Sequence, residues 1–138
     1  MEANETLNHQ PFRKRRVLVA DDNPDTADVL SMLIREMGHD THTAYNGREA
    51  VETAERVHAD AAILDIGMPE MNGFDVARSI RAQSWGKEMI LVALTGWGQD
   101  EDKRQAAAAG FDHHLTKPAG YEDLVRLLGE STSEDSRA

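Results

Sequence analysis

Five polar residues have the types and spacing to act together in chemistry. Each stands at the carboxyl end of an apolar run: Asp21, Asp22, Asp65, Thr95 and Lys117. If the apolar runs are parallel strands of one sheet, their carboxyl ends converge on a single rim, which is where open α/β sheets place their sites. The sequence therefore predicts one site that combines three carboxylates, a hydroxyl and an ammonium group.

Three carboxylates in one crevice repel one another, and protonation or a divalent cation relieves the repulsion. Mg²⁺ suits such a site because it binds through one or two carboxylates, keeps waters and leaves a coordination position for a phosphate. With all three acids ionised, Mg²⁺ and the ammonium of Lys117 bring the formal charge to zero. We therefore expect Mg²⁺ and no organic cofactor.

A carboxylate can attack phosphorus to form an aspartyl phosphate, while a metal and a lysine stabilise charge on the equatorial oxygens. Asp65 is the candidate nucleophile because it stands alone after the central apolar run, whereas Asp21 and Asp22 precede a helix and suit metal binding. Thr95 can donate its hydroxyl to the added phosphoryl charge. A cis Lys117–Pro118 bond would aim the lysine back over the rim.

Apolar runs rich in Val, Ile and Leu alternate with helical patterns along the chain. Continuous runs at 17–20, 61–64 and 89–94 predict strands buried on both faces, and weaker strands are expected at 41–44 and 111–115. Helices are expected from Pro24 to Met37, capped by Asn23 and ended by Gly38, and over 46–57, 73–80, 99–109 and 121–128. Five βα units predict an α/β doubly wound sandwich around a five-stranded parallel sheet.

Composition narrows the class of protein. The chain has 138 residues with 15 Lys plus Arg against 25 Asp plus Glu, and a net charge of −10 argues against DNA or RNA as the main partner. It has no cysteine and no apolar segment long enough for a bilayer, so we expect a cytoplasmic protein with no membrane partner. One domain is expected at 15–129, with flexible tails at 1–14 and 130–138.

The combined motifs resemble the receiver domain of two-component response regulators over about residues 15–129. They are Asp21-Asp22, Asp65 followed by Met68-Pro69 and Gly73, Ala93-Leu94-Thr95-Gly96, and Lys117-Pro118. The resemblance implies a flavodoxin-like (βα)5 three-layer sandwich with sheet order 2-1-3-4-5. It also implies Mg²⁺-dependent phosphotransfer to Asp65 from a histidine kinase or a histidine phosphotransfer protein.

The resemblance implies roles for single residues as well. Mg²⁺ would be held by Asp22, Asp65 and the backbone carbonyl of Gly67, with Asp21 acting through water. Thr95 would move toward the phosphoryl oxygens, and the side chain three residues before Lys117 would follow it. That side chain is His114 rather than the usual Tyr or Phe. Because imidazole is smaller, polar and titratable, its burial should be less favourable, and we expect a switch that is weaker or different in kind.

The stretches 96–98 and 110–115 resemble receivers attached to hybrid sensor kinases. This suggests a single-domain response regulator that works as a phosphorelay intermediate or as a switch that binds a downstream protein. We expect it to catalyse only its own phosphotransfer and dephosphorylation and not to turn over a substrate as an enzyme does. Trp97 is expected near the crevice. The sequence leaves the oligomeric state open, a weak homodimer included.

Other classes fit the residues less well. A small-molecule phosphohydrolase with an aspartate nucleophile usually has a second Asp two residues later, where this chain has Gly67. A flavodoxin-like cofactor binder needs a loop that cradles phosphate, but the loop after the first strand reads DDNPD and would repel one. A pseudo-receiver that only binds partners would not need the intact acidic set. His113 and His114 are strand neighbours that face opposite ways, so they do not form a transition-metal site.

Overall fold

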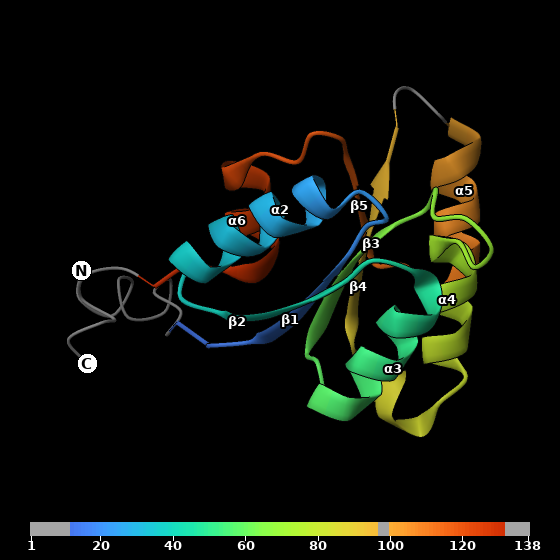
Figure 1. Ribbon diagram of the computed structural model, residues 1–138, viewed down its shortest axis with the longest axis horizontal. Helices are drawn as coiled ribbons and strands as arrows, with labels where there is room; N and C mark the ends of the chain where they lie inside the picture. Colours follow the sequence, from blue (N-terminus) through green and yellow to red (C-terminus); the bar gives the residue numbers. More distant parts are fainter. Residues whose placement is uncertain (1–11, 97–99, 132–138) are drawn as a thin grey trace, which may run out of the picture.

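Five parallel strands form the central sheet of the computed structural model, which describes residues 12–96 and 100–131 (Figure 1). The sheet order is β2-β1-β3-β4-β5, so the predicted order is confirmed. The strands are β1 (Arg16–Ala20), β2 (Asp40–Ala44), β3 (Ala61–Asp65), β4 (Ile90–Thr95) and β5 (His113–Thr116).

Helices cover both faces of the sheet and complete the three layers (Figure 1). On one face lie α2 (Pro24–Glu36) and α6 (Tyr121–Leu128). On the other lie α3 (Gly47–Val57), α4 (Gly73–Arg81) and α5 (Asp100–Ala109), and a short 3₁₀ helix, η1 (Ser84–Gly86), follows α4. The flavodoxin-like three-layer sandwich predicted from the sequence is thereby confirmed.

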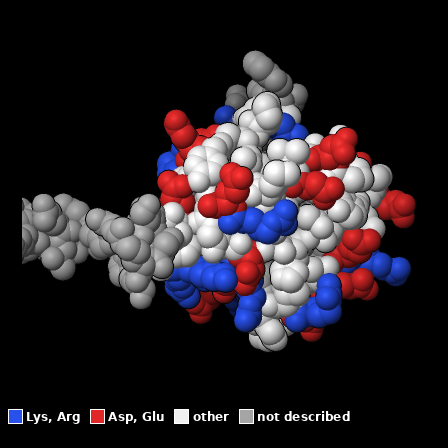
Figure 2. Space-filling view, turned by 60° about the vertical axis from the view of Figure 1, so that its left-hand side comes forward, with Lys and Arg blue, Asp and Glu red and all other residues white. Residues whose placement is uncertain are grey.

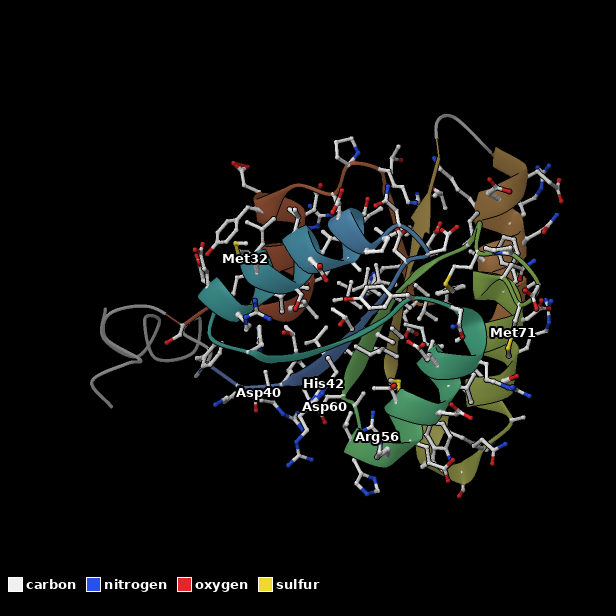
Figure 3. All side chains as sticks on the ribbon, in the orientation of Figure 1. Met32, Asp40, His42, Arg56, Asp60 and Met71 are labelled. Carbon is white, nitrogen blue, oxygen red and sulfur yellow. The ribbon has the colours of Figure 1, made fainter. Side chains whose placement is uncertain are left out.

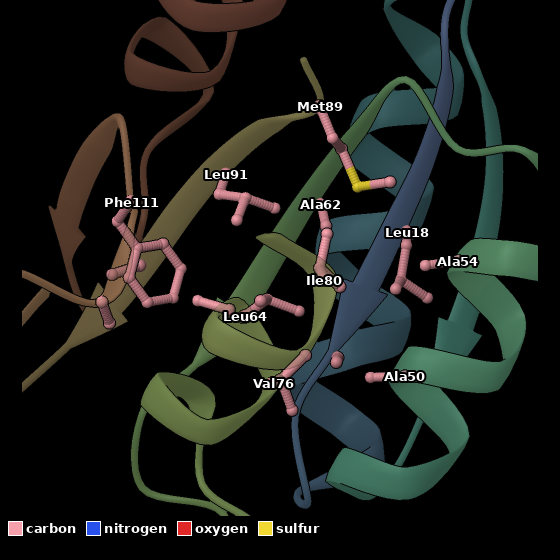
Figure 4. Packing of buried hydrophobic residues seen from close by; sticks show 14 of the residues in the cluster. Leu18, Ala50, Ala54, Ala62, Leu64, Val76, Ile80, Met89, Leu91 and Phe111 are labelled. Carbon is pink, nitrogen blue, oxygen red and sulfur yellow. The ribbon is translucent and has the colours of Figure 1, made fainter. Parts of the chain in front are cut away.

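Two hydrophobic cores lie on opposite sides of the sheet because strand side chains alternate between its faces. In β1, Val17 and Val19 join the core under α2 and α6, whereas Leu18 and Ala20 join the core under α3, α4 and α5. Figure 4 shows this second core, in which Leu18 and Leu64 meet side chains of α3 and α4 such as Ala54 and Ile80. The central strands are therefore buried on both faces, as their continuous apolar runs predict.

Side-chain caps begin α2 and α4 at the residues where the sequence predicts these helices to start. The side chain of Asn23 accepts hydrogen bonds from the backbone N–H groups of Asp25 and Thr26, and Pro24 occupies the first turn of α2. At α4, Asn72 and Asp75 form a reciprocal capping box. These caps start α2 and α4 immediately after the rim loops, which fixes the path of the chain on leaving β1 and β3.

The last strand is displaced from its predicted position. β5 covers His113–Thr116 rather than residues 111–115, because the backbone N–H of Phe111 donates to the carbonyl of Ala106 at the end of α5. The ring of Phe111 is buried in the core beneath α5. Its apolar character therefore serves helix packing rather than the sheet, and the strand starts two residues later.

Acidic partners accompany the basic run at residues 13–16. Lys14 Nζ lies 3.5 Å from Asp40 Oδ1, and the backbone N–H of Arg16 donates to Asp60 Oδ2 at 2.8 Å. Figure 3 shows Asp40 and Asp60 beside the starts of the strands, and Figure 2 shows basic and acidic side chains interspersed on the displayed face. Two acidic residues thus contact this run at the amino-terminal edge of the sheet.

Candidate functional site

Three aspartates meet at the carboxyl-terminal edge of the sheet. Asp21 and Asp22 follow β1, and Asp65 ends the neighbouring strand β3. One carboxylate oxygen from each lies within 4.8 Å of the others. Asp21 and Asp65 are buried, whereas Asp22 is exposed. The structure therefore brings together the three acids that the sequence singles out.

Lys117 reaches this cluster from the loop after β5. Its Nζ lies 3.0 Å from Asp21 Oδ2 and 3.1 Å from Asp65 Oδ1. The backbone N–H of Lys117 donates to the carbonyl of Thr95 at 2.8 Å, and the Lys117–Pro118 peptide is cis, as predicted. Burial alone would lower the pKa of Lys117, but hydrogen bonds and charges from Asp21 and Asp65 outweigh it and raise the pKa. The ammonium group is thus held in its charged form between the two buried acids.

Backbone donors orient the two buried carboxylates. The N–H of Asn23 donates to Asp21 Oδ1 at 2.9 Å, and the N–H of Gly67 donates to Asp65 Oδ1 at 3.0 Å. The remaining oxygen of Asp21, Oδ2, is buried and lies 3.0 Å from Nζ of Lys117. Three carboxylates with oxygens this close together, two of them buried, fit a hard divalent cation such as Mg²⁺.

The exposed aspartate responds electrostatically to its neighbours. Partial burial, a hydrogen bond to Asp65 and the negative charges of Asp65 and Asp21 together raise the pKa of Asp22. The raised pKa of Asp22 means that ionising all three neighbouring carboxylates is unfavourable in free energy. A bound cation would remove that cost, which agrees with the expectation from the sequence.

Close packing explains the glycine that opens α4. A Cβ atom on Gly73 would lie 2.6 Å from the carbonyl oxygen of Asp65. Helix α4 therefore starts in direct contact with the strand that ends at Asp65, and any side chain at this position would displace one of them. Gly73 thus belongs to the framework of the site.

Thr95 is not directed at Asp65 in this structure. It ends β4, is 2% exposed, and its hydroxyl donates to the carbonyl of Leu115 in β5 at 3.4 Å. His114 pairs in register with Ala93, lies in the edge strand β5 and is exposed. The predicted switch residues therefore lie on adjacent strands, with the hydroxyl turned toward the β5 backbone. Trp97 lies outside the described residues.

An apolar groove of about 450 Å³ opens beside Lys117, between α2 and the loop after β5. Its lining includes Val29, Leu30 and Leu33 of α2 together with Pro118 and Ala119. Val29 is 54% exposed, and Met32, one turn further along α2, is 53% exposed. This surface was not predicted from the sequence. The sequence did contain a sign of it, because Val29 and Met32 are apolar although they lie outside the face of the helix that packs against the sheet.

The comparisons with known proteins agree with this fold and site. Residues 17–129 match the response regulator receiver domain family, and the chain belongs to that family. The solved structures similar to it include the chemotaxis protein CheY4 of Vibrio cholerae, with 32% identity, a TM-score of 0.78 and coverage of 83% of this chain and 95% of that one. They also include the receiver domain of the sensor histidine kinase PA1611 of Pseudomonas aeruginosa, which has a magnesium ion in its active-site cleft. The latter is 31% identical, with a TM-score of 0.76 and coverage of 84% and 95%.

Curated relatives differ in length. An uncharacterized 14.6 kDa protein in the sodA1 3′ region of Leptolyngbya boryana is 34% identical over 119 residues, which cover 86% of this chain and 91% of that protein. The probable transcriptional regulatory protein TcrX of Mycobacterium tuberculosis is 37% identical over 112 residues, covering 81% of this chain. The match covers only 47% of TcrX, so the chain spans about half the length of that regulator.

Among the described residues, none of the helices combines the length and the apolar character that crossing a membrane requires.

Proposed function

We propose that Asp65 accepts a phosphoryl group from the phosphohistidine of a sensor kinase or a histidine phosphotransfer protein, in a Mg²⁺-dependent reaction. The observation that carries this proposal is the position of Lys117, whose ammonium lies within 3.1 Å of both Asp65 and Asp21 beside a third carboxylate. A nucleophilic carboxylate, a fixed cation and a site for a divalent metal are the parts that phosphoryl transfer needs.

The reaction makes one bond and breaks one. A carboxylate oxygen of Asp65 attacks phosphorus as the P–N bond to the donor imidazole breaks, and the bonding electrons return to that nitrogen. Lys117 stabilises negative charge on the transferred group, and the N–H of Gly67 holds the carboxylate in place. When bound, Mg²⁺ would supply further charge stabilisation at the phosphoryl oxygens, with Asp22, Asp65 and the carbonyl of Gly67 as ligands and Asp21 acting through water.

The transfer changes the charge balance of the site. A carboxylate of charge −1 becomes a phosphoryl group of roughly −2, which calls for another donor. Thr95 can provide it by releasing the carbonyl of Leu115, because its present hydrogen bond is long at 3.4 Å. We propose that His114, on the same strand as Leu115, then changes position. The domain would act in this way as a relay intermediate or as a switch that binds a downstream protein.

The apolar groove beside Lys117 is the proposed docking surface for the phosphodonor. It adjoins the acidic site and is bordered by the exposed side chain of Val29. An apolar contact at this place would align the donor histidine with Asp65 without adding further charge to the cluster.

Gly67 favours signalling over phosphoester turnover. It stands two residues after Asp65, where a phosphohydrolase of the competing class usually has an acid/base aspartate, and it has no side chain to move a proton. Water would therefore attack the aspartyl phosphate without that assistance, and the phosphoryl group would persist long enough to be passed on or sensed.

The proposal is tested by incubating the protein with acetyl phosphate and Mg²⁺ and measuring its intact mass. We expect a single phosphoryl adduct in the wild type and none in Asp65→Asn. Asp102→Asn, in α5, is a matched control that should retain the adduct. An adduct that persists in Asp65→Asn would identify a different phosphorylated residue.

A further inference from the structure

His39 is a buried histidine far from the acidic site. It lies between α2 and β2, at the amino-terminal edge of the sheet, and is 3% exposed. The backbone N–H of Arg15 donates to its Nδ1 at 3.0 Å, and its Nε2 lies 2.7 Å from the carbonyl oxygen of Gly129. An N–H can only donate and a carbonyl can only accept. The ring must therefore be neutral, with its proton on Nε2.

Two chain segments that are remote in sequence meet around this ring. Phe12 packs against it with ring centroids 5.1 Å apart, and Arg15 Nε donates to the carbonyl of Leu128 at 3.3 Å. The N–H of Ser131 donates to the carbonyl of Met37 at 2.7 Å. Figure 1 shows residues 12–15, before β1, and residues 129–131, after α6, on the same side of the molecule. His39 is the side chain that bonds to both segments.

Gly38 makes room for this junction. It has a φ of +106°, and a Cβ atom there would lie 2.9 Å from Cβ of Ser131 and 3.0 Å from Cζ of Phe12. The turn between α2 and β2 is therefore shaped to receive both segments closely against the backbone.

The charged groups near His39 are already engaged or oppose its protonation. Burial has the largest effect and lowers the pKa of His39, and the positive charge of Arg15 lowers it further. The carbonyl of Gly129, and to a smaller extent the carbonyl of Leu128 and the charge of Asp40, raise the pKa without offsetting the burial. Asp40 lies 3.5 Å from Lys14, which offsets its charge. On the adjoining elements, Arg35 bonds to Ser31 and Thr41, and Glu130 accepts from Tyr121.

We propose that His39 is a proton-operated latch that joins residues 12–15 to residues 128–131 when neutral and releases them when protonated. A proton taken from solvent by Nδ1 removes the lone pair that accepts the N–H of Arg15, so two donors then face each other. The new positive charge also lies beside Arg15. The latch is at the opposite edge of the sheet from Asp65 and does not depend on the proposed phosphotransfer.

Amide hydrogen exchange tests the latch on the intact protein. After correction for the pH dependence of intrinsic exchange, the N–H groups of Arg15 and Ser131 should lose about tenfold or more of their protection between pH 7.5 and pH 5. Amides in β3 should keep theirs. An NMR titration of His39 should show the Nε2–H tautomer at pH 7.5 and a midpoint below that of an exposed histidine.

Variants separate the titration from simple packing. In His39→Gln, the amide oxygen can accept from Arg15 and the amide nitrogen can donate to Gly129, so protection should be largely retained at pH 7.5 and independent of pH. His42→Gln, on the neighbouring strand β2, should behave like the wild type. Equal protection at both pH values in the wild type, or an unchanged pH response in His39→Gln, would overturn the proposal.

Discussion

Nζ of Lys117 lies 3.1 Å from Oδ1 of Asp65, the same oxygen that accepts a hydrogen bond from the backbone N–H of Gly67. One oxygen of the candidate nucleophile is therefore held from two directions by donors on different loops. Charge-assisted contacts of this kind fix the orientation of the carboxylate. The site is ordered around Asp65 by the fold itself.

Replacing Lys117 tests its part in phosphoryl transfer. Lys117→Gln removes the cation that stabilises charge on the transferred group, so phosphorylation by acetyl phosphate should slow by about 10²-fold, the range for losing one preorganised donor. The rate is measured from the time course of the intact-mass adduct. Lys103→Gln, in α5, should match the wild type, and an unchanged rate in Lys117→Gln would exclude a role for this lysine in the chemistry.

The raised pKa of Asp22 predicts how stability depends on pH. The folded protein keeps a proton on Asp22 at pH values where the unfolded chain has lost it. The contribution of Asp22 to the free energy of unfolding therefore falls as the pH rises from the usual carboxyl pKa through the raised one. Above both pKa values this contribution no longer changes with pH. Asp22→Asn should remove this loss and raise the melting temperature at pH 7 in the absence of metal by a few degrees.

The stabilisation of the folded protein by Mg²⁺ should increase as the pH rises over the same range. Binding requires ionised Asp22, so the rise in melting temperature on adding Mg²⁺ should grow with pH in the wild type and be largely lost in Asp22→Asn. Differential scanning calorimetry at pH 4 to 7.5, with Mg²⁺ and with EDTA, measures both effects. A metal response in Asp22→Asn equal to that of the wild type would remove Asp22 from the ligand set.

The hydrogen bond from Thr95 to Leu115 predicts that a substitution of Thr95 can impair the response to phosphorylation with little loss of stability. Because this bond is long, Thr95→Val should cost less than about 1 kcal/mol in free energy of unfolding. The variant should still form the adduct, yet the amide chemical shifts of β5, including that of His114, should change much less on phosphorylation. Thr43→Val in β2 serves as the control, and a full β5 response in Thr95→Val would argue against the proposed coupling.

The features predicted from the sequence are those determined by local patterns. Apolar runs located β1 and β3, Asn23 and Pro24 located the start of α2, and parallel pairing then placed Asp21 and Asp65 on one rim. Each depends on a short stretch of chain or on a general rule of sheet geometry.

The features that escaped the sequence depend on contacts between remote segments. Phe111 was predicted to lie in a strand, but its ring packs beneath α5. No pattern in the sequence singled out His39, whose ring lies between Arg15 and Gly129. The hydroxyl of Thr95 donates to the carbonyl of Leu115 on the neighbouring strand, a partner that the sequence does not identify. Tertiary packing decided all three.

The groove beside α2 predicts a variant that impairs docking without affecting chemistry. Val29 is 54% exposed, so Val29→Glu should fold normally, yet its charge would lie in the apolar groove next to an already acidic site. Transfer from a histidine phosphotransfer protein that phosphorylates the wild type should slow by about tenfold or more, whereas the reaction with acetyl phosphate should stay unchanged.

Gln83→Glu, just before η1 and outside the groove lining, adds the same charge and should leave both reactions intact. If Val29→Glu slowed the reactions with both donors equally, the groove would contribute to the chemistry of the site rather than to recognition of the donor protein. If it slowed neither reaction, the donor protein would dock elsewhere.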